Sequence, residues 1–303
     1  MILYLKPYFS SRPWHGTLLS KIYECPQDTG EAWICSGYHE KSSIISNGEY
    51  QGLSLEAFFN EHKSDFFHME NEKEFPILMK IIDADEDLSV QVHPDNDYAK
   101  THHNANGKFE SWYFLPGNKA SKVVVGLKCQ TKEELKKIID EKRIMATLNY
   151  ENIQSGSYLS IKPGTVHALK GGSLVLETQQ PSDITYRLYD YDRKPLRELH
   201  INDSLNVIDF ENKAGIKDFS KNASEENKYF LFEKMAIETS KQIITNSNVQ
   251  IVYIINGSGK INGNIISKYN TLLLIGEKIV TLEGEMEVAL VTPKNKYLCV
   301  SII

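Results

Sequence analysis

Histidine and carboxylate side chains recur in three segments with strand-like alternation, and their types suit a divalent metal ion. In 88–94 (LSVQVHP) polar residues alternate with apolar ones, so on a strand Gln91 and His93 share a face. In 107–115 (GKFESWYFL) the same spacing places Lys108 and Glu110 on one face. In 156–167 a Pro-Gly turn follows a strand-like run and returns His167 toward the sheet. The three segments therefore predict one inward-facing polar cluster.

Two histidines, a carboxylate and an amide carbonyl fit a site for Zn²⁺ or a similar divalent ion, with a position left open for a ligand. Taken singly, each residue has a plainer explanation. His93 or His167 alone is more often a hydrogen-bonded structural histidine, and Glu110 alone a solvated charge. An amide is an uncommon zinc ligand, so a core hydrogen bond explains Gln91 equally well. The joint pattern favours a metal, because inward polar groups without partners are costly.

A fourth segment, 173–190 (SLVLETQQPSDITYRLYD), carries a second set of candidates. Period two places Glu177 on the face opposite the neighbouring leucines. A carboxylate beside a metal-bound substrate is a candidate general base, and the guanidinium of Arg187 suits a phosphate group or a developing oxyanion. The alternative is an ion pair from Asp183 or Glu177 to Arg187 that only stabilises the fold.

The chain has 303 residues, of which 41% are hydrophobic, enough for one large domain or two smaller ones. Its net charge of −6 argues against nucleic acid as a partner. No segment approaches the ~20 apolar residues of a membrane span, and the start lacks a signal-peptide pattern, so we expect a cytoplasmic protein. The four cysteines lack CxxC spacing, which favours isolated, reduced thiols.

All nine histidines, all five arginines and all three tryptophans lie at or before His200. The chemistry is therefore expected in the first two thirds of the chain. The polar stretch 215–228 (GIKDFSKNASEENK) is predicted to be a linker or long loop. We expect two domains, a metal-binding catalytic domain at 1–215 and a smaller C-terminal β domain at 216–303.

The pattern predicts a mainly β protein with a few helices. Helices are expected after Ser54 and after Thr131, where Thr131 and Glu134 form a capping box. A short polar loop is expected between the strand that carries His93 and Gly107. Beyond the linker, β-branched and aromatic runs alternate with the Asn/Gly turns NGSG and NGN, which predicts a small β-sandwich. Its edge strands are a possible dimer surface, so the protein is expected to be a monomer or a homodimer.

Over residues 1–210 the chain resembles the type I mannose-6-phosphate isomerases, in particular their short bacterial form. The resemblance rests on QVHPDNDYA, GKFESWY, PGTVHAL, LVLETQQPSDITYRLYDYDR and RELH, which occur in the family's order, and on RPWHG and GEAW near the start. It implies a cupin, or jelly-roll, β-barrel. It also implies one Zn²⁺ per chain, or another divalent metal. The family's ligand positions are occupied in this chain by Gln91, His93, Glu110 and His167.

The resemblance further implies the reversible interconversion of mannose 6-phosphate and fructose 6-phosphate through a cis-enediol. Arg187 falls on the catalytic arginine, while Lys108 and Glu177 fall on pocket positions and Asp183 is a further pocket candidate. We expect Glu177 to move the proton, Arg187 to stabilise the enediolate or hold the substrate, and Lys108 to supply positive charge to the phosphate or ring oxygens.

Only 56 residues separate Glu110 from His167, so the chain lacks the helical domain that longer family members carry there. It departs from the family's usual pattern at WHG, at Pro181 and at Asp192. None of these positions is an expected metal ligand. Pro181 and Asp192 do flank the segment that carries Arg187, so the departures bear on substrate preference.

Two other functions fit parts of the pattern. An Fe(II) cupin oxygenase also uses histidine and glutamate ligands, but the usual HxH pair is here QxH. A regulatory cupin that binds a sugar phosphate without turnover would keep the same pocket. In each sugar-phosphate case the partner is a small molecule.

Overall fold

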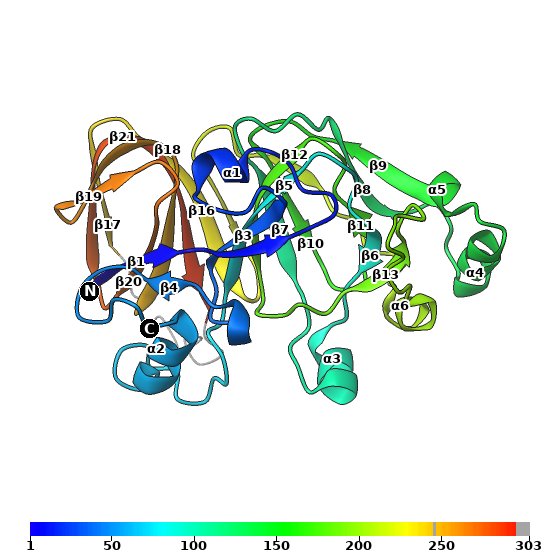
Figure 1. The fold of residues 1–303 in the computed structure, drawn as a ribbon, viewed down its shortest axis with the longest axis horizontal. Coiled ribbons are helices and arrows are strands. Elements are labelled where there is room, and N and C mark those ends of the chain that lie inside the picture. The colour runs from blue at the N-terminus through cyan, green and yellow to red at the C-terminus, as the bar shows by residue number, and fades with distance from the viewer. Residues whose placement is uncertain (245–246, 295–303) are drawn as a thin grey trace, which may run out of the picture. The chain divides into compact units, whose positions relative to one another are not determined.

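The structure is a computed structural model, and it describes residues 1–244 and 247–294. It is mainly β with short helices, as the sequence predicts (Figure 1), and its strands form three antiparallel sheets. Cys25, Cys35 and Cys129 are free thiols, and Cys299 lies outside the described residues. Within the described ranges, no helix has the length and apolar character needed to cross a membrane.

The chain divides into two compact units that interleave along the sequence. One unit comprises 1–8, 33–79 and 218–303, and the other comprises 9–32 and 80–217. The first unit therefore combines N-terminal segments with the whole C-terminal part. The functional division into a catalytic part, 1–215, and a C-terminal part, 216–303, stays a prediction.

The first unit contains a nine-stranded sheet with the order β15-β16-β21-β18-β20-β1-β4, to which β17 and β19 are added at the strands β21 and β18. Its apolar core draws on both ends of the chain, because Leu272 and Val288 pack with the partly buried Ile2. The strands are β1 (Ile2–Lys6), β4 (Ile44–Ile45), β15 (Ala223–Glu226), β16 (Phe230–Ile237), β17 (Ser240–Ile244), β18 (Val249–Ile261), β19 (Asn264–Ser267), β20 (Thr271–Ile275) and β21 (Ile279–Pro293).

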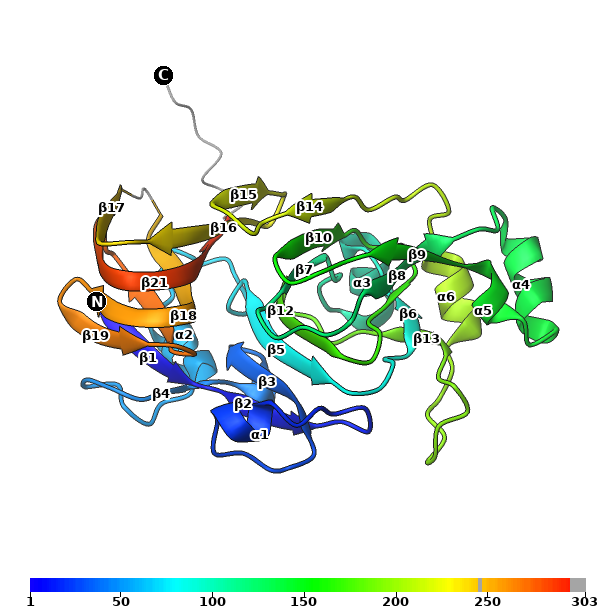
Figure 2. The same ribbon diagram turned by 90° about the horizontal axis from the view of Figure 1, so that it is seen from above.

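The second unit holds most of a seven-stranded sheet, β14-β10-β7-β12-β5-β3-β2, and all of a five-stranded sheet, β13-β6-β11-β8-β9 (Figure 2). The seven-stranded sheet consists of β2 (Tyr8–Ser11), β3 (Thr29–Cys35), β5 (Leu78–Ala84), β7 (Glu110–Phe114), β10 (Ser157–Ile161), β12 (Ser173–Gln179) and β14 (Ile216–Asp218). The five-stranded sheet consists of β6 (Val90–Val92), β8 (Lys122–Leu127), β9 (Leu148–Asn152), β11 (His167–Ala168) and β13 (Tyr186–Tyr189).

These two sheets share an apolar core that fixes which faces point inward. Trp112 and Phe114 of β7 and Val175 of β12 pack in one cluster with Val123 and Val125 of β8. Because side chains alternate along a strand, every second residue from these positions faces the same interior. The interior between the two sheets is where the polar candidates must lie if they form one site.

Both predicted helices are confirmed. The helix α2 (Leu55–His62) begins with a hydrogen bond from the backbone N–H of Ala57 to Oγ of Ser54, and α4 (Lys132–Asp140) begins with one from the N–H of Glu134 to Oγ1 of Thr131. The described helices also include α1 (Leu19–Ile22), α3 (Asn96–His103), α5 (Ile144–Thr147), α6 (Ile201–Val207) and the 3-10 turn His39–Lys41.

The helices α4, α5 and α6 gather at one end of the second unit, on the right in Figure 1. Leu135 of α4 and Ile144 of α5 pack in a cluster with Val92 and Val124 of the five-stranded sheet, and Leu205 of α6 contacts it. These helices therefore cover the face of that sheet that points away from the shared interior.

The prediction of a polar loop before Gly107 is wrong, because most of that segment forms the helix α3. The Asp95 side chain accepts a hydrogen bond from the N–H of Tyr98 at 2.8 Å and so caps the first turn. The helix ends at Asn104, which adopts the left-handed conformation that asparagine tolerates. The helix is so polar that its apolar periodicity was too weak to be recognised.

Two expectations for the C-terminal part also need correction. The NGSG sequence is not a turn, since Asn256 to Gly259 continue β18 past a β-bulge after Ile254, whereas NGN does form the turn between β18 and β19. The predicted linker 215–228 contains the two strands β14 and β15, which pair with β10 and β16. Polar residues are tolerated there because edge strands leave side chains exposed to water.

Candidate metal centre

Strand register brings the candidates of the five-stranded sheet into one row. His167 of β11 lies opposite Gln91 of β6, and Arg187 of β13 lies opposite Gln91 from the other side. His167 also lies opposite Val125, which belongs to the shared core. Residues directly opposite each other in antiparallel strands share a face, so this row points into the interior between the sheets.

The seven-stranded sheet contributes its candidates to the same interior. Glu110 lies two residues before Trp112 on β7, so both side chains point to the same face, and Gln179 of β12 lies opposite Glu110. Glu177 lies opposite Trp112, whose ring is part of the shared core. Both carboxylates therefore face the row formed by His167, Gln91 and Arg187.

His93, Glu110 and His167 converge, with one candidate ligand atom from each lying within 4.8 Å of the others. Nε2 of His167 is 3.2 Å from Oε1 of Glu110, and Nε2 of His93 is 3.4 Å from Oε2. All three side chains are buried, with at most 1% exposure. Over the described parts of the chain this is the one grouping of three or more such side chains that is close enough to hold a metal ion.

Both imidazoles are held with Nε2 toward the glutamate. Nδ1 of His93 donates to the carbonyl of Ile184 and Nδ1 of His167 to the carbonyl of Thr165, each at 2.8 Å. Burial, with the nearby charge of Lys108, lowers the pKa of His93 to about 3, and burial also lowers the pKa of His167. Both rings are therefore neutral, and a neutral imidazole that donates through Nδ1 presents a lone pair at Nε2. Their short distances to Glu110 are not ion pairs.

The Nε2 atoms of the two histidines and the carboxylate oxygens of Glu110 are therefore all hydrogen-bond acceptors that face one another. A divalent cation bound between them would stabilise this arrangement. Both carboxylate oxygens of Glu110 are buried without a hydrogen bond of acceptable geometry. Nζ of Lys108 lies 2.9 Å from Oε2 and forms an ion pair by distance, but its angles do not suit a hydrogen bond. Burial would raise the pKa of Glu110, but the positive charge of Lys108 holds it well below its usual value, so the carboxylate is ionised. The residues present fit a bound metal ion.

Gln91 lies at the edge of this cluster. Its Nε2 is 3.3 Å from Nε2 of His167, and its Oε1 accepts a weak hydrogen bond from Ser89 at 3.4 Å. In this orientation the amide nitrogen, not the oxygen, is nearest the cluster. Coordination through Oε1 needs a 180° rotation of the amide group, which exchanges two atoms of similar size.

Glu177 accepts a hydrogen bond on one side and forms a buried ion pair on the other. Trp112 donates from Nε1 to Oε1 at 3.1 Å, and Nζ of Lys80 lies 3.2 Å from Oε2. Burial raises the pKa of Glu177, and the charges of Lys80 and Lys108 offset only part of this effect. A carboxylate with a raised pKa is suited to accept and return a proton near neutral pH.

Lys80 was missed by the sequence analysis. It stands in the run LMKII of β5 and is 3% exposed. A single lysine within a strand that is otherwise apolar on both faces is the signal that was available, because a buried lysine requires a partner. The sequence did not identify that partner.

The remaining candidates surround the cluster at different depths. Lys108 is buried, and although burial alone would lower its pKa, the carboxylates of Glu110 and Glu177 raise it. Asp183 interacts electrostatically with both Lys108 and Arg187. Nε of Arg187 is buried without a hydrogen bond to any described residue.

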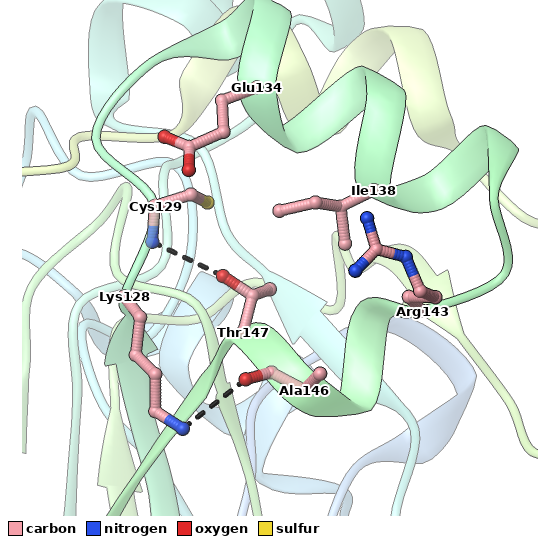
Figure 3. Close-up of a pocket in the computed structure, with 7 residues that line it drawn as sticks. All are labelled: Lys128, Cys129, Glu134, Ile138, Arg143, Ala146 and Thr147. Carbon is pink, nitrogen blue, oxygen red and sulfur yellow. Dashed lines mark hydrogen bonds between the residues drawn. The ribbon is translucent and has the colours of Figure 1, made fainter.

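A surface hollow of about 180 Å³ lies elsewhere in this unit, beside α4 and α5 (Figure 3). Nζ of Lys128 donates to the carbonyl of Ala146, and the N–H of Cys129 donates to Oγ1 of Thr147, both at 3.2 Å. Burial raises the pKa of the Cys129 thiol, so the sulfur stays protonated and weakly nucleophilic. None of the candidate residues lines this hollow, and it is not the candidate site.

The fold and the cluster together define a mainly β protein with a buried His/Glu/His cluster that could hold a metal ion, with charged residues around it. Residues 14–119 match the family described as phosphomannose isomerase type I, catalytic domain. The chain is 36% identical to the mannose-6-phosphate isomerase ManA of Bacillus subtilis over 305 aligned residues, which cover 94% of this chain and 96% of that protein. It belongs to the type I phosphomannose isomerase family.

Solved structures agree with this assignment. The crystal structure of the mannose 6-phosphate isomerase from Bacillus subtilis superimposes with a TM-score of 0.87 at 30% identity, over 96% of this chain and 99% of that one. A mannose 6-phosphate isomerase bound with zinc and yttrium superimposes with a TM-score of 0.77 over 97% of this chain and 100% of that one. Its identity is 16%, so this second likeness shows the fold alone.

Proposed function

We propose that the chain interconverts mannose 6-phosphate and fructose 6-phosphate at the cluster between the two sheets of the second unit. It is an aldose–ketose isomerase by its membership of the family. The observation that carries the proposal is the convergence of His93, Glu110 and His167, with Nε2 of each histidine directed at an ionised glutamate. The substrate would bind beside this cluster, between Glu177 and Arg187.

The proposed metal is Zn²⁺, one per chain, held by His93, Glu110, His167 and Gln91. Two imidazoles and a carboxylate are common zinc ligands, and the related structure described above contains zinc. When bound, such an ion supplies Lewis-acid polarisation of the sugar oxygens. We also propose that the two sheets form a cupin jelly-roll barrel. The facing positions of His167 and Glu110, which come from different sheets, support that arrangement.

Glu177 is the proposed base. It would take the proton from C2 of the aldose while the hydroxyl proton of O2 passes to O1, which gives the cis-enediol with O2 deprotonated, an enediolate. Return of that proton from Glu177 to C1, as the negative charge on O2 forms the C2 carbonyl, gives the ketose, and no redox cofactor is consumed. The fixed position of the carboxylate, between Trp112 and Lys80, supports this role because a proton carrier must reach both carbons without moving far.

Arg187 and Lys108 are the proposed electrostatic partners of the reacting oxygens. Arg187 lies in the row of Gln91 and His167, and its buried Nε–H donates to no described residue, so it can donate to a substrate oxygen. The ammonium of Lys108 lies 3.2 Å from Nε2 of His93. Positive groups fixed in a site with little water stabilise the negative charge that develops on an enediolate. Asp183 would orient these two cations.

Purified protein, dialysed against a chelator and then loaded with Zn²⁺, should convert mannose 6-phosphate to fructose 6-phosphate in a coupled assay run anaerobically. Turnover without oxygen would separate an isomerase from an Fe(II) oxygenase, which needs oxygen as a co-substrate. Binding of the sugar phosphate without turnover would instead favour the regulatory module. Sedimentation would decide between the predicted monomer and homodimer, and the predicted cytoplasmic location stays a prediction.

A further inference from the structure

Arg197 is clamped by a buried carboxylate close to the proposed site. Its Nε donates to Oδ2 of Asp190 at 2.6 Å, and its Nη2 donates to Oδ1 at 2.5 Å. The Asp190 side chain is 6% exposed, whereas that of Arg197 is 24% exposed. A two-bond contact of this kind fixes the plane of a guanidinium. It leaves Nη1 of Arg197 without a hydrogen bond to any residue in the described ranges.

Arg12 is held in the same manner by another carboxylate of this unit. Its Nε and Nη2 donate to the two oxygens of Glu31 at 3.0 and 2.9 Å. The Glu31 side chain is 10% exposed and that of Arg12 is 27% exposed. The segment beneath is packed so tightly that a Cβ at Gly30 would lie 2.6 Å from Cβ of Arg12 and 2.9 Å from the ring of Trp14. The position of Arg12 is therefore set by the backbone as well as by the ion pair.

Both guanidiniums act electrostatically on that of Arg187. The N–H of His200 donates to the carbonyl of Arg187 at 2.8 Å, which brings the segment that carries Arg197 beside β13. Burial lowers the pKa of Arg187, and the positive charges of Arg197 and Arg12 lower it further, against the opposing effects of Asp190 and Asp183. The carboxylates of Glu31 and Asp190 offset part of the repulsion among these guanidiniums, and a bound anion would offset more of it. The strand register places Arg187 next to Gln91, in the row that contains the metal cluster. Arg12 and Arg197 are partly exposed to solvent, whereas Arg187 lies in the row that contains the metal cluster.

We propose that Arg12, fixed by Glu31, and Arg197, fixed by Asp190, flank Arg187 and bind the phosphate group of the substrate. Asp190 also pairs with Arg193, at 3.1 Å. This assignment rests on the proposed function. The lysines Lys80 and Lys108 are less suited to the phosphate, because they are at most 5% exposed, whereas Arg12 and Arg197 are 27% and 24% exposed. A planar guanidinium matches the oxygens of a phosphate, and the phosphate is attached at C6, remote from the reacting carbons C1 and C2.

The proposal predicts that binding is lost while the chemical step is retained. In Arg197→Gln and in Arg12→Gln, KM for mannose 6-phosphate should rise about 10- to 100-fold, the range expected for loss of a hydrogen bond to a charged group, with kcat changed less than about threefold. Inorganic phosphate should inhibit the zinc-loaded wild type competitively, and its inhibition constant should rise in parallel with KM. Asp190→Asn, which keeps the charge of Arg197 but weakens its clamp, should give a smaller rise in both constants.

Arg143→Gln is the matched control, because Arg143 also pairs with a carboxylate, that of Glu141, but lies among the residues that line the surface hollow. Its kinetic constants should equal those of the wild type. The proposal is overturned if kcat falls at constant KM, if neither constant changes, or if phosphate does not compete. Arg197→Lys serves if the glutamine variant fails to fold, since a lysine keeps the charge and should retain part of the phosphate affinity.

Failure of the proposed function would look different. Wild-type protein that does not turn over mannose 6-phosphate contradicts the isomerase assignment, but calorimetric titration with inorganic phosphate still tests the arginines. Binding to the wild type that weakens in Arg12→Gln and Arg197→Gln, and not in Arg143→Gln, would support the phosphate site even then. Equal binding in all four proteins would overturn it.

Discussion

Nζ of Lys80 lies 3.2 Å from Oε2 of Glu177, and both side chains are 4% exposed. This buried pair sets the protonation of the proposed base. Burial raises the pKa of Glu177, and the ammonium of Lys80 is the largest of the effects that oppose it. A base must be deprotonated to act, so activity is lost as the pH falls through this pKa.

Lys80→Met should therefore move the acid limb of the kcat/KM profile to higher pH. Removal of the ammonium leaves the burial effect opposed mainly by Lys108, so Glu177 binds its proton more tightly and is active only at higher pH. The measurement is kcat/KM for mannose 6-phosphate across pH in the variant and the wild type. An acid limb that stays in place, or moves to lower pH, would show that Lys80 does not control the base.

Glu177→Gln should abolish most of the turnover and the exchange of solvent hydrogen into the product. Loss of a general base typically reduces the rate about 10²- to 10⁴-fold, and the amide keeps the shape of the side chain while losing its basicity. Deuterium incorporation at C1 and C2, followed by NMR in heavy water, measures the proton transfer directly. Undiminished exchange and turnover would remove Glu177 from this role.

Chelation should inactivate the protein, and stoichiometric Zn²⁺ should restore activity. Because Glu110 and the two histidines direct acceptor atoms at one another, the metal-free cluster is less favourable than the loaded one, and Zn²⁺ should also raise Tm. Metal analysis should give one ion per chain for the wild type and much less for His167→Gln.

The matched control for that substitution is His39→Gln, because the His39 side chain is 73% exposed and belongs to the first unit. This variant should keep both its metal and its activity. Full activity of chelated wild type, or metal retention by His167→Gln equal to that of the control, would contradict the metal site.

Substitutions at two glycines of the first unit should distinguish the cost of backbone strain from the cost of a steric clash. Gly257 and Gly263 have φ values of +78° and +80°, but a Cβ at Gly257 would lie 2.1 Å from the carbonyl oxygen of Glu285, whereas one at Gly263 meets nothing within 4 Å. Gly263→Ala should lower the free energy of unfolding by about 1 to 2 kcal/mol, the cost of a left-handed residue. Gly257→Ala should lower it by more than about 3 kcal/mol, because β18 and β21 must separate. Equal losses in denaturant unfolding would contradict the steric argument.

The sequence by itself determined much of the fold. Alternation along LSVQVHP and SLVLETQ predicted strands with Gln91 and Glu177 on polar faces, and the caps at Ser54 and Thr131 predicted α2 and α4. These features are local, since they depend on hydrogen bonds within a turn or on the period of one strand. The sequence failed where the local signal was weak or misleading, as in the polar helix α3 and in the NGSG residues of β18.

Only the tertiary structure decided which distant residues meet. The partner of Lys80 is 97 positions away, and the clamps of Arg12 and Arg197 are visible only once side chains are placed. The division into interleaved units, with Ile2 packed against Leu272, also has no local signature. The physical reason is that strand order and register are long-range properties. They depend on which apolar faces can be buried together, and no segment carries that information alone.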